Sequence, residues 1–286
     1  MTLARQTSQY YGLKHHVSMI SEADFRSDYA PIIAAMDLPT IDGVNTWFVS
    51  RAAAEAGYKV AISGLGADEI LGGYPSLVDV PAIMKCAGSL AQVPLFGRWF
   101  RWITAGLVSQ FTSPKFAGIF EYGGTYGGAN LLRRALYMPW ELPMLIDPEI
   151  VKQGWVDLQP LNANSSRVRV SGLELQYYMR NMLLRDSDWA RMARCLEIRL
   201  PFADVEFYRH LAPYISGLHP PSKAMLLKCP STPAPKVVLN RSKSGFGVPI
   251  DHWITKHRTQ DRGLRGWGKK VVESFVTDKH IINTRS

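Results

Sequence analysis

The chain has 286 residues, with 47% hydrophobic and 20% charged side chains and a formal net charge of +9. This composition suits one large or two small globular domains. No uncharged apolar run reaches the roughly 18 residues of a membrane span, and residues 1–6 lack the apolar core of a signal peptide. The positive charge permits binding of polyanions, but the basic residues are spread along the chain, so nucleic-acid binding is not expected.

The first part of the chain alternates predicted helices and strands. Residues 4–11 indicate the end of a helix, and residues 15–20 indicate a strand. Ser21 is the predicted cap of the next helix, and residues 46–56 form another. The apolar run at residues 59–62 is typical of a buried parallel strand. This alternation predicts a parallel sheet with helices on both faces, which binds ligands at the carboxyl ends of its strands.

Beyond the first 75 residues the pattern turns helical, with repeated Gly and Pro punctuation. Residues 173–193 give the longest helical signal, and the proline-containing residues 217–235 predict a loop. We therefore expect two parts: residues 1–75 as a partial nucleotide-binding α/β portion, and residues 76–286 as a helical remainder.

A glycine-rich turn, SGLGADEILGGY at residues 63–74, directly follows the predicted strand. Glycines at 64 and 66 let the backbone approach a ligand, and the N–H groups at the start of the following helix favour phosphate. Asp68 is a candidate magnesium ligand because hard cations prefer oxygen, although a helix cap is the alternative. Glu69 is either a second ligand or a partner of the helix dipole. The predicted nucleotide-binding residues are Ser63, Gly64, Leu65 and Gly66.

Three blocks in order resemble the glutamine-hydrolysing asparagine synthetases. The glycine turn is similar to their SGxGxDExxGGY motif. LLRDSD at residues 183–188, followed by MA and then by LEIRLPFAD at residues 196–204, is similar to LxRxD…MAxxLExRxPFLD. KSGFGVPIDHW at residues 243–253 is similar to KxGFxxPxxxW. The resemblance spans about residues 4–253, and it implies an ATP-pyrophosphatase-like α/β fold, incomplete at its N-terminus.

The resemblance also implies a reaction and its participants. ATP adenylates the side-chain carboxylate of aspartate with release of pyrophosphate, and ammonia derived from glutamine then displaces AMP to give asparagine. Lys243 matches the lysine that stabilises negative charge on the phosphates, unless it is only a solvated loop lysine. Asp42 is a substrate candidate, and Glu197 with Arg199 is expected to form a buried ion pair that supports the site. The implied cofactors are ATP and Mg²⁺.

Two parts of this family's pattern are absent from the sequence. No cysteine stands near the N-terminus, where the glutaminase nucleophile would lie, and the pyrophosphate loop SGGxDS does not occur. We therefore expect the C-terminal part of a synthetase, with the missing portion on the same or a separate chain, little activity by itself, and a homodimer as an open alternative. Asp68 would share its magnesium with a carboxylate of the missing loop. The cysteines have no pairing or metal-binding spacing, which favours a reducing cytoplasm; they are Cys86, Cys195 and Cys229.

Leu65 departs from the family pattern, since many members carry Glu between the two glycines. Leucine neither accepts a proton nor binds a cation, so the ammonia step is the one in question. This keeps two alternatives open: a relative that acts on another carboxylate, either lactam-forming or amidating, and a truncated, non-catalytic remnant.

Overall fold

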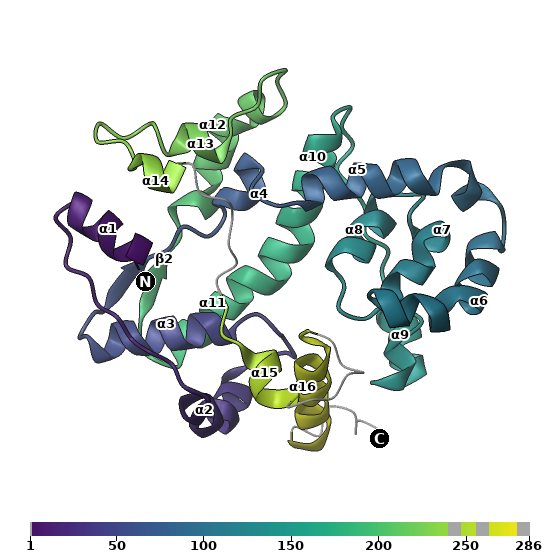
Figure 1. Ribbon diagram of the computed structural model, residues 1–286, viewed down its shortest axis with the longest axis horizontal. Helices are drawn as coiled ribbons and strands as arrows, with labels where there is room; N and C mark the ends of the chain where they lie inside the picture. Colours follow the sequence, from purple (N-terminus) through teal and green to yellow (C-terminus); the bar gives the residue numbers. More distant parts are fainter. Residues whose placement is uncertain (1, 240–246, 256–262, 279–286) are drawn as a thin grey trace.

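The structure is a computed structural model, and it describes residues 2–239, 247–255 and 263–278. Helices dominate it, and Figure 1 shows a long central helix with a small sheet on one side and helices α5 to α9 on the other. No helix in the described ranges is both long and apolar enough to cross a membrane. The helices are α1 Thr2–Tyr10, α2 Glu22–Ala35, α3 Val44–Glu55, α4 Ala67–Leu71, α5 Ser76–Ala87, α6 Phe96–Phe111, α7 Ile119–Tyr122, α8 Tyr126–Arg134, α9 Pro148–Gly154, α10 Ser166–Leu173, α11 Leu184–Met192, α12 Val205–Ile215, α13 Lys223–Leu226, α14 Lys236–Leu239, α15 Ile250–Thr255 and α16 Arg265–Asp278.

The sheet of the described residues has two parallel strands, β1 Val60–Ile62 and β2 Glu197–Arg199. Val60 pairs with Glu197 and Ile62 with Arg199, so the glycine turn and the LEIRLPF block lie at the same end of the sheet. The strand predicted at residues 59–62 is therefore confirmed. The prediction that this strand is buried is wrong, because Val60 is 41% and Ile62 76% exposed. A larger sheet covered by helices on both faces stays a prediction.

The strand predicted at residues 15–20 does not form. The segment has no helix or strand assignment, although the ring of His16 lies 6.3 Å from that of Tyr58, just before β1. A β-strand needs a partner to satisfy its backbone groups, and among the described strands none pairs with this segment. Val17 and Met19 are exposed to solvent. The segment therefore stays irregular, although its residues favour a strand.

Helix α2 begins where its sequence predicts. The hydroxyl of Ser21 accepts a hydrogen bond from the backbone N–H of Asp24, and the Asp24 carboxylate accepts one from the backbone N–H of Ser21. This reciprocal capping box satisfies two backbone donors that a helix start leaves open. Helix α3 also agrees with the helix predicted at residues 46–56, and it ends just before Gly57, which has a φ of +83°.

The longest helical signal corresponds to one continuous rod through residues 166–192. Helix α10 passes into the π-helical segment Glu174–Leu183 and then into α11, with helical backbone angles at both junctions. π-Helical segments of this kind are rare and often accompany functional sites. The segment carries Glu174 and Tyr178, which reach toward the glycine turn as described below.

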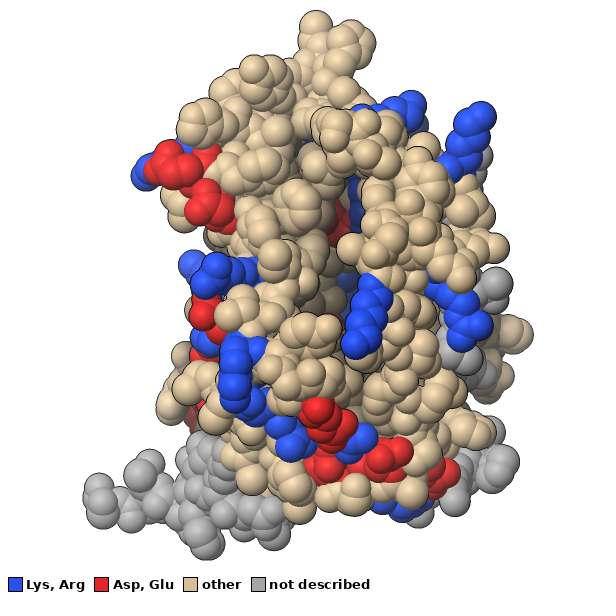
Figure 2. Space-filling model, turned by 90° about the vertical axis from the view of Figure 1, so that its left-hand side faces the viewer, with Lys and Arg blue, Asp and Glu red and all other residues tan. Residues whose placement is uncertain are grey.

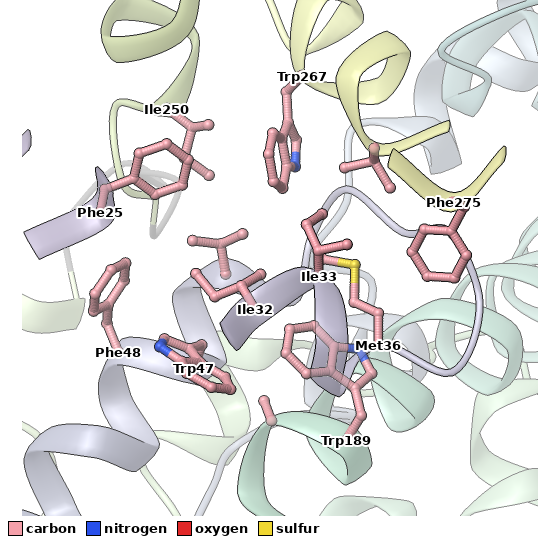
Figure 3. Close-up of a cluster of buried hydrophobic side chains, with 13 residues drawn as sticks. Phe25, Ile32, Ile33, Met36, Trp47, Phe48, Trp189, Ile250, Trp267 and Phe275 are labelled. Atoms are coloured by element: carbon pink, nitrogen blue, oxygen red, sulfur yellow. The ribbon is translucent and has the colours of Figure 1, made fainter. Parts of the chain in front are cut away.

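The main hydrophobic core joins distant parts of the chain. Figure 3 shows Trp267 and Phe275 of α16 above Ile32 of α2, with Trp47 of α3 and Trp189 of α11 beneath. Each of these five side chains is at most 5% exposed. Large aromatic side chains contribute most of the burial energy of such a cluster, so the C-terminal helix α16 helps to hold the N-terminal helices in place. The division predicted at residue 75 stays a prediction.

The loop predicted at residues 217–235 is mostly irregular, and it contains the short helix α13. Figure 2 views the molecule from the left-hand side of Figure 1, where basic side chains are separated by acidic and neutral ones. No continuous basic surface is visible on this face, which gives no support to nucleic-acid binding there.

Candidate active site

The glycine turn, residues 63–74, follows β1 at the carboxyl end of the sheet and contains the short helix α4. The N–H of Ser63 donates to the carbonyl of Arg199 at 2.9 Å, which continues the β1–β2 pairing into the turn. Gly66 has a φ of +99°, and a Cβ there would lie 2.8 Å from the carbonyl oxygen of Phe202. Only glycine meets both requirements without strain. The turn is thus built against the PFAD segment, so two of the three motif blocks are in direct contact.

Gly64 differs from Gly66 because it faces open space. A Cβ at Gly64 would meet no atom within 4 Å, and the residue is exposed. Its backbone is therefore accessible to a ligand, as the glycine pattern predicts. Leu65 is half-buried, and its N–H donates to the Ser63 hydroxyl at 3.3 Å.

Asp68 lies in the first turn of α4 and pairs with a lysine that the sequence did not identify. The Nζ atom of Lys223, at the start of α13, is 2.7 Å from Oδ1 of Asp68. Gly73 makes room for this carboxylate, because a Cβ at position 73 would collide with it. Arg167 lies against Gly72, and its Nη2 donates to the carbonyl of Pro221 at 2.9 Å. Two cations therefore border the glycine turn.

The described residues contain no complete magnesium site. Hard cations take six or more oxygen ligands, often from two carboxylates. No group of three or more His, Cys, Asp or Glu side chains with metal-binding geometry occurs within the described ranges. Asp68 is the carboxylate of this motif, and in this structure the ammonium of Lys223 stands at its Oδ1 atom, where a metal cation would otherwise bind. The predicted sharing of the metal with another carboxylate stays a prediction.

Glu69 turns away from Asp68 into the interior, where it is 2% exposed. Its carboxylate accepts a hydrogen bond from the Tyr74 hydroxyl at 2.7 Å. Burial raises the pKa of Glu69, because a desolvated carboxylate is costly to ionise. Asp42 has a similar partner: it accepts from the Tyr178 hydroxyl at 2.7 Å. Each of these two predicted residues is thus joined to a tyrosine of one cluster.

The two tyrosines belong to a cluster of side chains around Arg134. We call it the Arg134 cluster, and it consists of Tyr74, Arg134, Glu174 and Tyr178. The guanidinium lies 4.2 Å from the ring centre of Tyr74 and 4.1 Å from that of Tyr178. Its Nη2 is 2.7 Å from Oε2 of Glu174, a side chain only 1% exposed. A buried carboxylate requires such a partner. The cluster connects helix α8 and the π-helical segment to the end of the glycine turn.

The LLRDSD block holds the loop before α3. Arg185 makes a two-pronged pair with Asp37, with both shorter contacts at 2.9 Å. Asp186 is buried and accepts from the Thr40 hydroxyl at 2.8 Å and from the indole N–H of Trp189 at 3.1 Å. Burial raises the pKa of Asp186 to about 6. The block therefore has a structural role in placing the loop that carries Asp42.

This carboxyl gives the chain a testable pH dependence. The folded-state pKa of Asp186, about 6, lies above the ordinary value of 3.8, so between these values the folded state binds more protons than the unfolded state. The contribution of Asp186 to stability is therefore fully present below about pH 4, and it declines by about 3 kcal/mol as the pH rises to about 6. We expect Asp186→Asn to remove this decline in urea unfolding measured from pH 4 to 7.

A matched control is Asp188→Asn, because Asp188 is about half exposed and pairs with Arg191 on the surface. It should leave the pH profile unchanged. An Asp186→Asn variant with the wild-type slope over this range would assign the titration to another group.

The expected burial of the Glu197–Arg199 pair is wrong. Nε of Arg199 donates to Glu197 at 2.8 Å, but the two side chains are 53% and 64% exposed and lie on strand β2. Alternate residues of a strand share one face, and here that face is open to solvent. An exposed pair of this kind contributes at most about 1 kcal/mol.

Lys243 and the residues around it, 240–246, lie outside the described residues. Its predicted approach to Asp68 therefore stays a prediction. Five residues of the observed arrangement were not identified in the sequence: Lys223, Arg167, Arg134, Glu174 and Tyr178. Lys223 lies in a segment predicted as a loop, 155 positions from its partner. Arg134 and Tyr178 lie on helices whose packing the sequence pattern does not determine.

Comparisons with known proteins agree with the motifs. The family profile described as asparagine synthase matches residues 1–277. Asparagine synthetase [glutamine-hydrolyzing] 1 of Bacillus subtilis (strain 168) is 24% identical over 293 residues, covering 98% of this chain and 44% of that protein. A putative asparagine synthetase [glutamine-hydrolyzing] of Mycobacterium tuberculosis (strain H37Rv) is 28% identical over 269 residues, covering 88% and 39%.

The chain spans less than half the length of these relatives. No solved structure matches it significantly. The family match covers nearly the whole chain. In the structure, the glycine turn packs directly against the PFAD segment. The resemblance seen in the sequence is confirmed, and the chain belongs to the asparagine synthase family.

Proposed function

We propose that this chain is the synthetase part of an ATP-dependent, AMP-forming amide ligase that adenylates aspartate and transfers ammonia to give asparagine. The observation that carries the proposal is the glycine turn at the carboxyl end of β1, with Asp68 and Lys223 beside it, in a chain of the asparagine synthase family. Parallel α/β sheets bind nucleotides at this edge. The relatives' names support aspartate as the acceptor, and their greater length supports a further portion in the working enzyme.

In this proposal the turn binds the phosphates of ATP. The open backbone at Gly64 approaches them, and Lys223 and Arg167 offset their negative charge. A carboxylate oxygen of aspartate attacks the α-phosphorus, and pyrophosphate leaves. Ammonia then attacks the acyl carbon, AMP leaves, and the new amide loses a proton. Magnesium, when bound, neutralises phosphate charge, and Asp68 would be one of its ligands.

The Arg134 cluster would position the turn rather than react. Glu69 and Asp42 contact its tyrosines through hydrogen bonds, so helix α4 is anchored on one side by buried polar groups. Preorganised donors act on a charged transition state without having to reorient. Lys243 would supply a further positive charge to the phosphates. Glu197 and Arg199 are assigned no chemical role, because both are exposed and paired with each other.

A second candidate rests on Leu65, which is half-buried next to Gly64. A leucine there leaves the ammonia step without the carboxylate that many family members carry. A relative that amidates another carboxylate, or closes a lactam, would keep the same adenylation step. The two candidates therefore differ in the acceptor and in the nucleophile, while both release pyrophosphate.

The test measures pyrophosphate release from ATP by two proteins: residues 1–286 alone, and the same residues joined to the segment encoded immediately upstream. Without a pyrophosphate loop, several preorganised donors are lost, each contributing about 10²- to 10³-fold in rate. We expect little release by residues 1–286 alone and aspartate-dependent release by the joined chain.

Three outcomes would contradict parts of this proposal. Robust release by residues 1–286 alone would show that no further portion is needed. Release by the joined chain with another carboxylic acid, and not with aspartate, would favour the second candidate. A joined, folded chain that binds no ATP and releases no pyrophosphate would favour a non-catalytic remnant.

A further inference from the structure

The C-terminal helix α16 is fixed beside the loop that carries Asp42. At the start of this helix, Nη2 of Arg265 lies 2.5 Å from Oε1 of Glu141, and the two side chains are only 11% and 6% exposed. Nη1 of Arg265 donates to the carbonyl of Leu136 at 2.7 Å, and the Tyr137 hydroxyl donates to the carbonyl of Arg265 at 2.8 Å. Buried polar groups that are paired with one another favour a single arrangement. The start of α16 therefore has a defined position on the segment that follows α8.

The first turn of α16 contacts this loop directly. Trp267 is fully buried, and Figure 3 shows its indole ring extending from α16 into the core. The indole N–H donates to the backbone carbonyl of Ile41 at 3.2 Å. The helix packs closely here because the next residue is Gly268, where a Cβ would lie 2.6 Å from Cδ2 of Leu136. A buried indole N–H needs an acceptor, so this hydrogen bond fixes the backbone immediately before Asp42.

The side chain of Asp42 is held from the other direction, by the Arg134 cluster. Its carboxylate accepts a hydrogen bond from the Tyr178 hydroxyl at 2.7 Å. The ring centre of Tyr178 lies 5.8 Å from that of Tyr74, the last residue of the glycine turn. Asp42 is therefore separated from the glycine turn by two side chains in contact, and its position depends on both Trp267 and Tyr178.

The charge of Asp42 is not neutralised by the described part of the chain. Its recorded partner is a hydroxyl group, and no Lys or Arg side chain pairs with it within the described ranges. By contrast, Asp37 of the same loop pairs with Arg185. A half-buried carboxylate is stabilised by a cation, and an ammonium group forms strong, charge-assisted hydrogen bonds with a carboxylate. Asp42 is thus suited to an acceptor that carries an ammonium group.

We propose that Asp42 binds the ammonium group of an amino-acid acceptor, and that Trp267 is a positioning residue that holds Asp42 for this contact. The proposal rests on the proposed adenylation of aspartate, and it assigns the group that distinguishes an amino acid from a plain dicarboxylic acid. A site that binds a polar group of its substrate rejects an analogue without that group, because its own polar side chain is then left unpaired. Succinate is such an analogue, since it is aspartate without the ammonium group.

Pyrophosphate release with aspartate and with succinate tests the recognition, in the chain joined to its upstream segment. The measured preference is the ratio of kcat/KM for the two acids. We expect a preference for aspartate of about 10²-fold or more, which Asp42→Asn lowers at least about tenfold through KM for aspartate, with KM for ATP within about twofold of the wild type. An unchanged preference in Asp42→Asn would overturn the recognition. Equal release with both acids by the wild type would also overturn it and leave the adenylation step intact, whereas no release with either acid would contradict the proposed function itself.

Trp267→Phe tests the positioning, because phenylalanine still fills much of the core but donates no hydrogen bond. The matched control is Trp47→Phe. Trp47 belongs to the same core and is also buried, but its indole N–H donates to Asp28 of α2 at 2.7 Å rather than to the loop. Both variants lose a buried donor, so both should lose a similar amount of stability. Only Trp267→Phe should lower the preference for aspartate, by about five- to tenfold.

Amide hydrogen exchange of residues 37–46 gives a readout that needs no turnover. It is followed by mass spectrometry on residues 1–286. We expect exchange about tenfold faster in Trp267→Phe than in the wild type, because the loop loses a buried contact, and unchanged exchange in Trp47→Phe. Equal exchange in the two variants would overturn the positioning role of Trp267. A preference for aspartate that Trp47→Phe lowers as much as Trp267→Phe would overturn it too.

Discussion

Replacement of Asp68 by Asn is expected to lower ATP-dependent pyrophosphate release about 10³-fold in the chain joined to its upstream segment. Asp68 lies within the glycine turn, and its carboxylate is 2.7 Å from the ammonium of Lys223. Asparagine has nearly the same shape but no charge, so it neither holds a cation firmly nor keeps Lys223 in place. Loss of one preorganised electrostatic group at a charged transition state typically costs about 10²- to 10³-fold in rate.

The control for this substitution is Asp79→Asn. Like Asp68, Asp79 pairs with a cation, since Nε of Arg133 lies 2.7 Å from its carboxylate. It lies on α5, however, and its partner is Arg133 rather than Lys223. It should retain nearly full activity. Both variants should unfold within about 1 kcal/mol of the wild type, since their carboxylates are partly exposed. An Asp68→Asn enzyme with undiminished pyrophosphate release would remove Asp68 from the site.

The parts of the fold that follow from local sequence are those with local physical causes. The cap at Ser21 depends on atoms within three residues, and the positive φ at Gly66 depends on glycine alone. The strand at residues 15–20 could not be predicted correctly in the same way. Its alternating pattern is compatible with a strand, but a strand exists only with a partner, and the described strands supply none.

In the candidate site, too, the residues identified from the sequence are those close together in it, and the residues missed come from distant segments. Asp68 and the glycine turn were identified because all their residues are contiguous in sequence. Lys223 reaches Asp68 from a distant segment, so no spacing rule could have identified it. The pair Glu197–Arg199 was expected in the interior because its motif precedes a turn near the site and buried charges need partners. The open face of β2 instead leaves both side chains in water. Burial depends on what covers an element, which a single sequence does not specify.

The largest expected effect on stability concerns the Arg134 cluster. Arg134→Met should lower the free energy of unfolding by about 3–5 kcal/mol, because it leaves the buried Glu174 carboxylate without its cation. Asn130, whose side-chain amide donates to the Glu174 carboxylate at 3.3 Å, would remain as a neutral polar partner. Methionine fills much of the volume of arginine, so the loss reports the charge and the stacking on Tyr74 and Tyr178 rather than a cavity.

The neighbouring residue supplies the control. Arg133 also pairs with a carboxylate, that of Asp79 at 2.7 Å, but its side chain is 38% and that of Asp79 43% exposed. Arg133→Met should therefore cost no more than about 1 kcal/mol in urea unfolding at pH 7. The two variants remove the same charge from the same helix, α8, so a difference between them reports the burial of the Arg134 pair together with its stacking on Tyr74 and Tyr178.

A second substitution distinguishes a buried unpaired charge from lost packing. Without Arg134, the Glu174 carboxylate, whose side chain is 1% exposed, is left without its cation. Glu174→Gln removes that charge and keeps nearly the same shape, so adding Glu174→Gln to Arg134→Met should recover part of the loss at pH 7. An Arg134→Met deficit equal to that of Arg133→Met would show that the buried pair does not stabilise this fold.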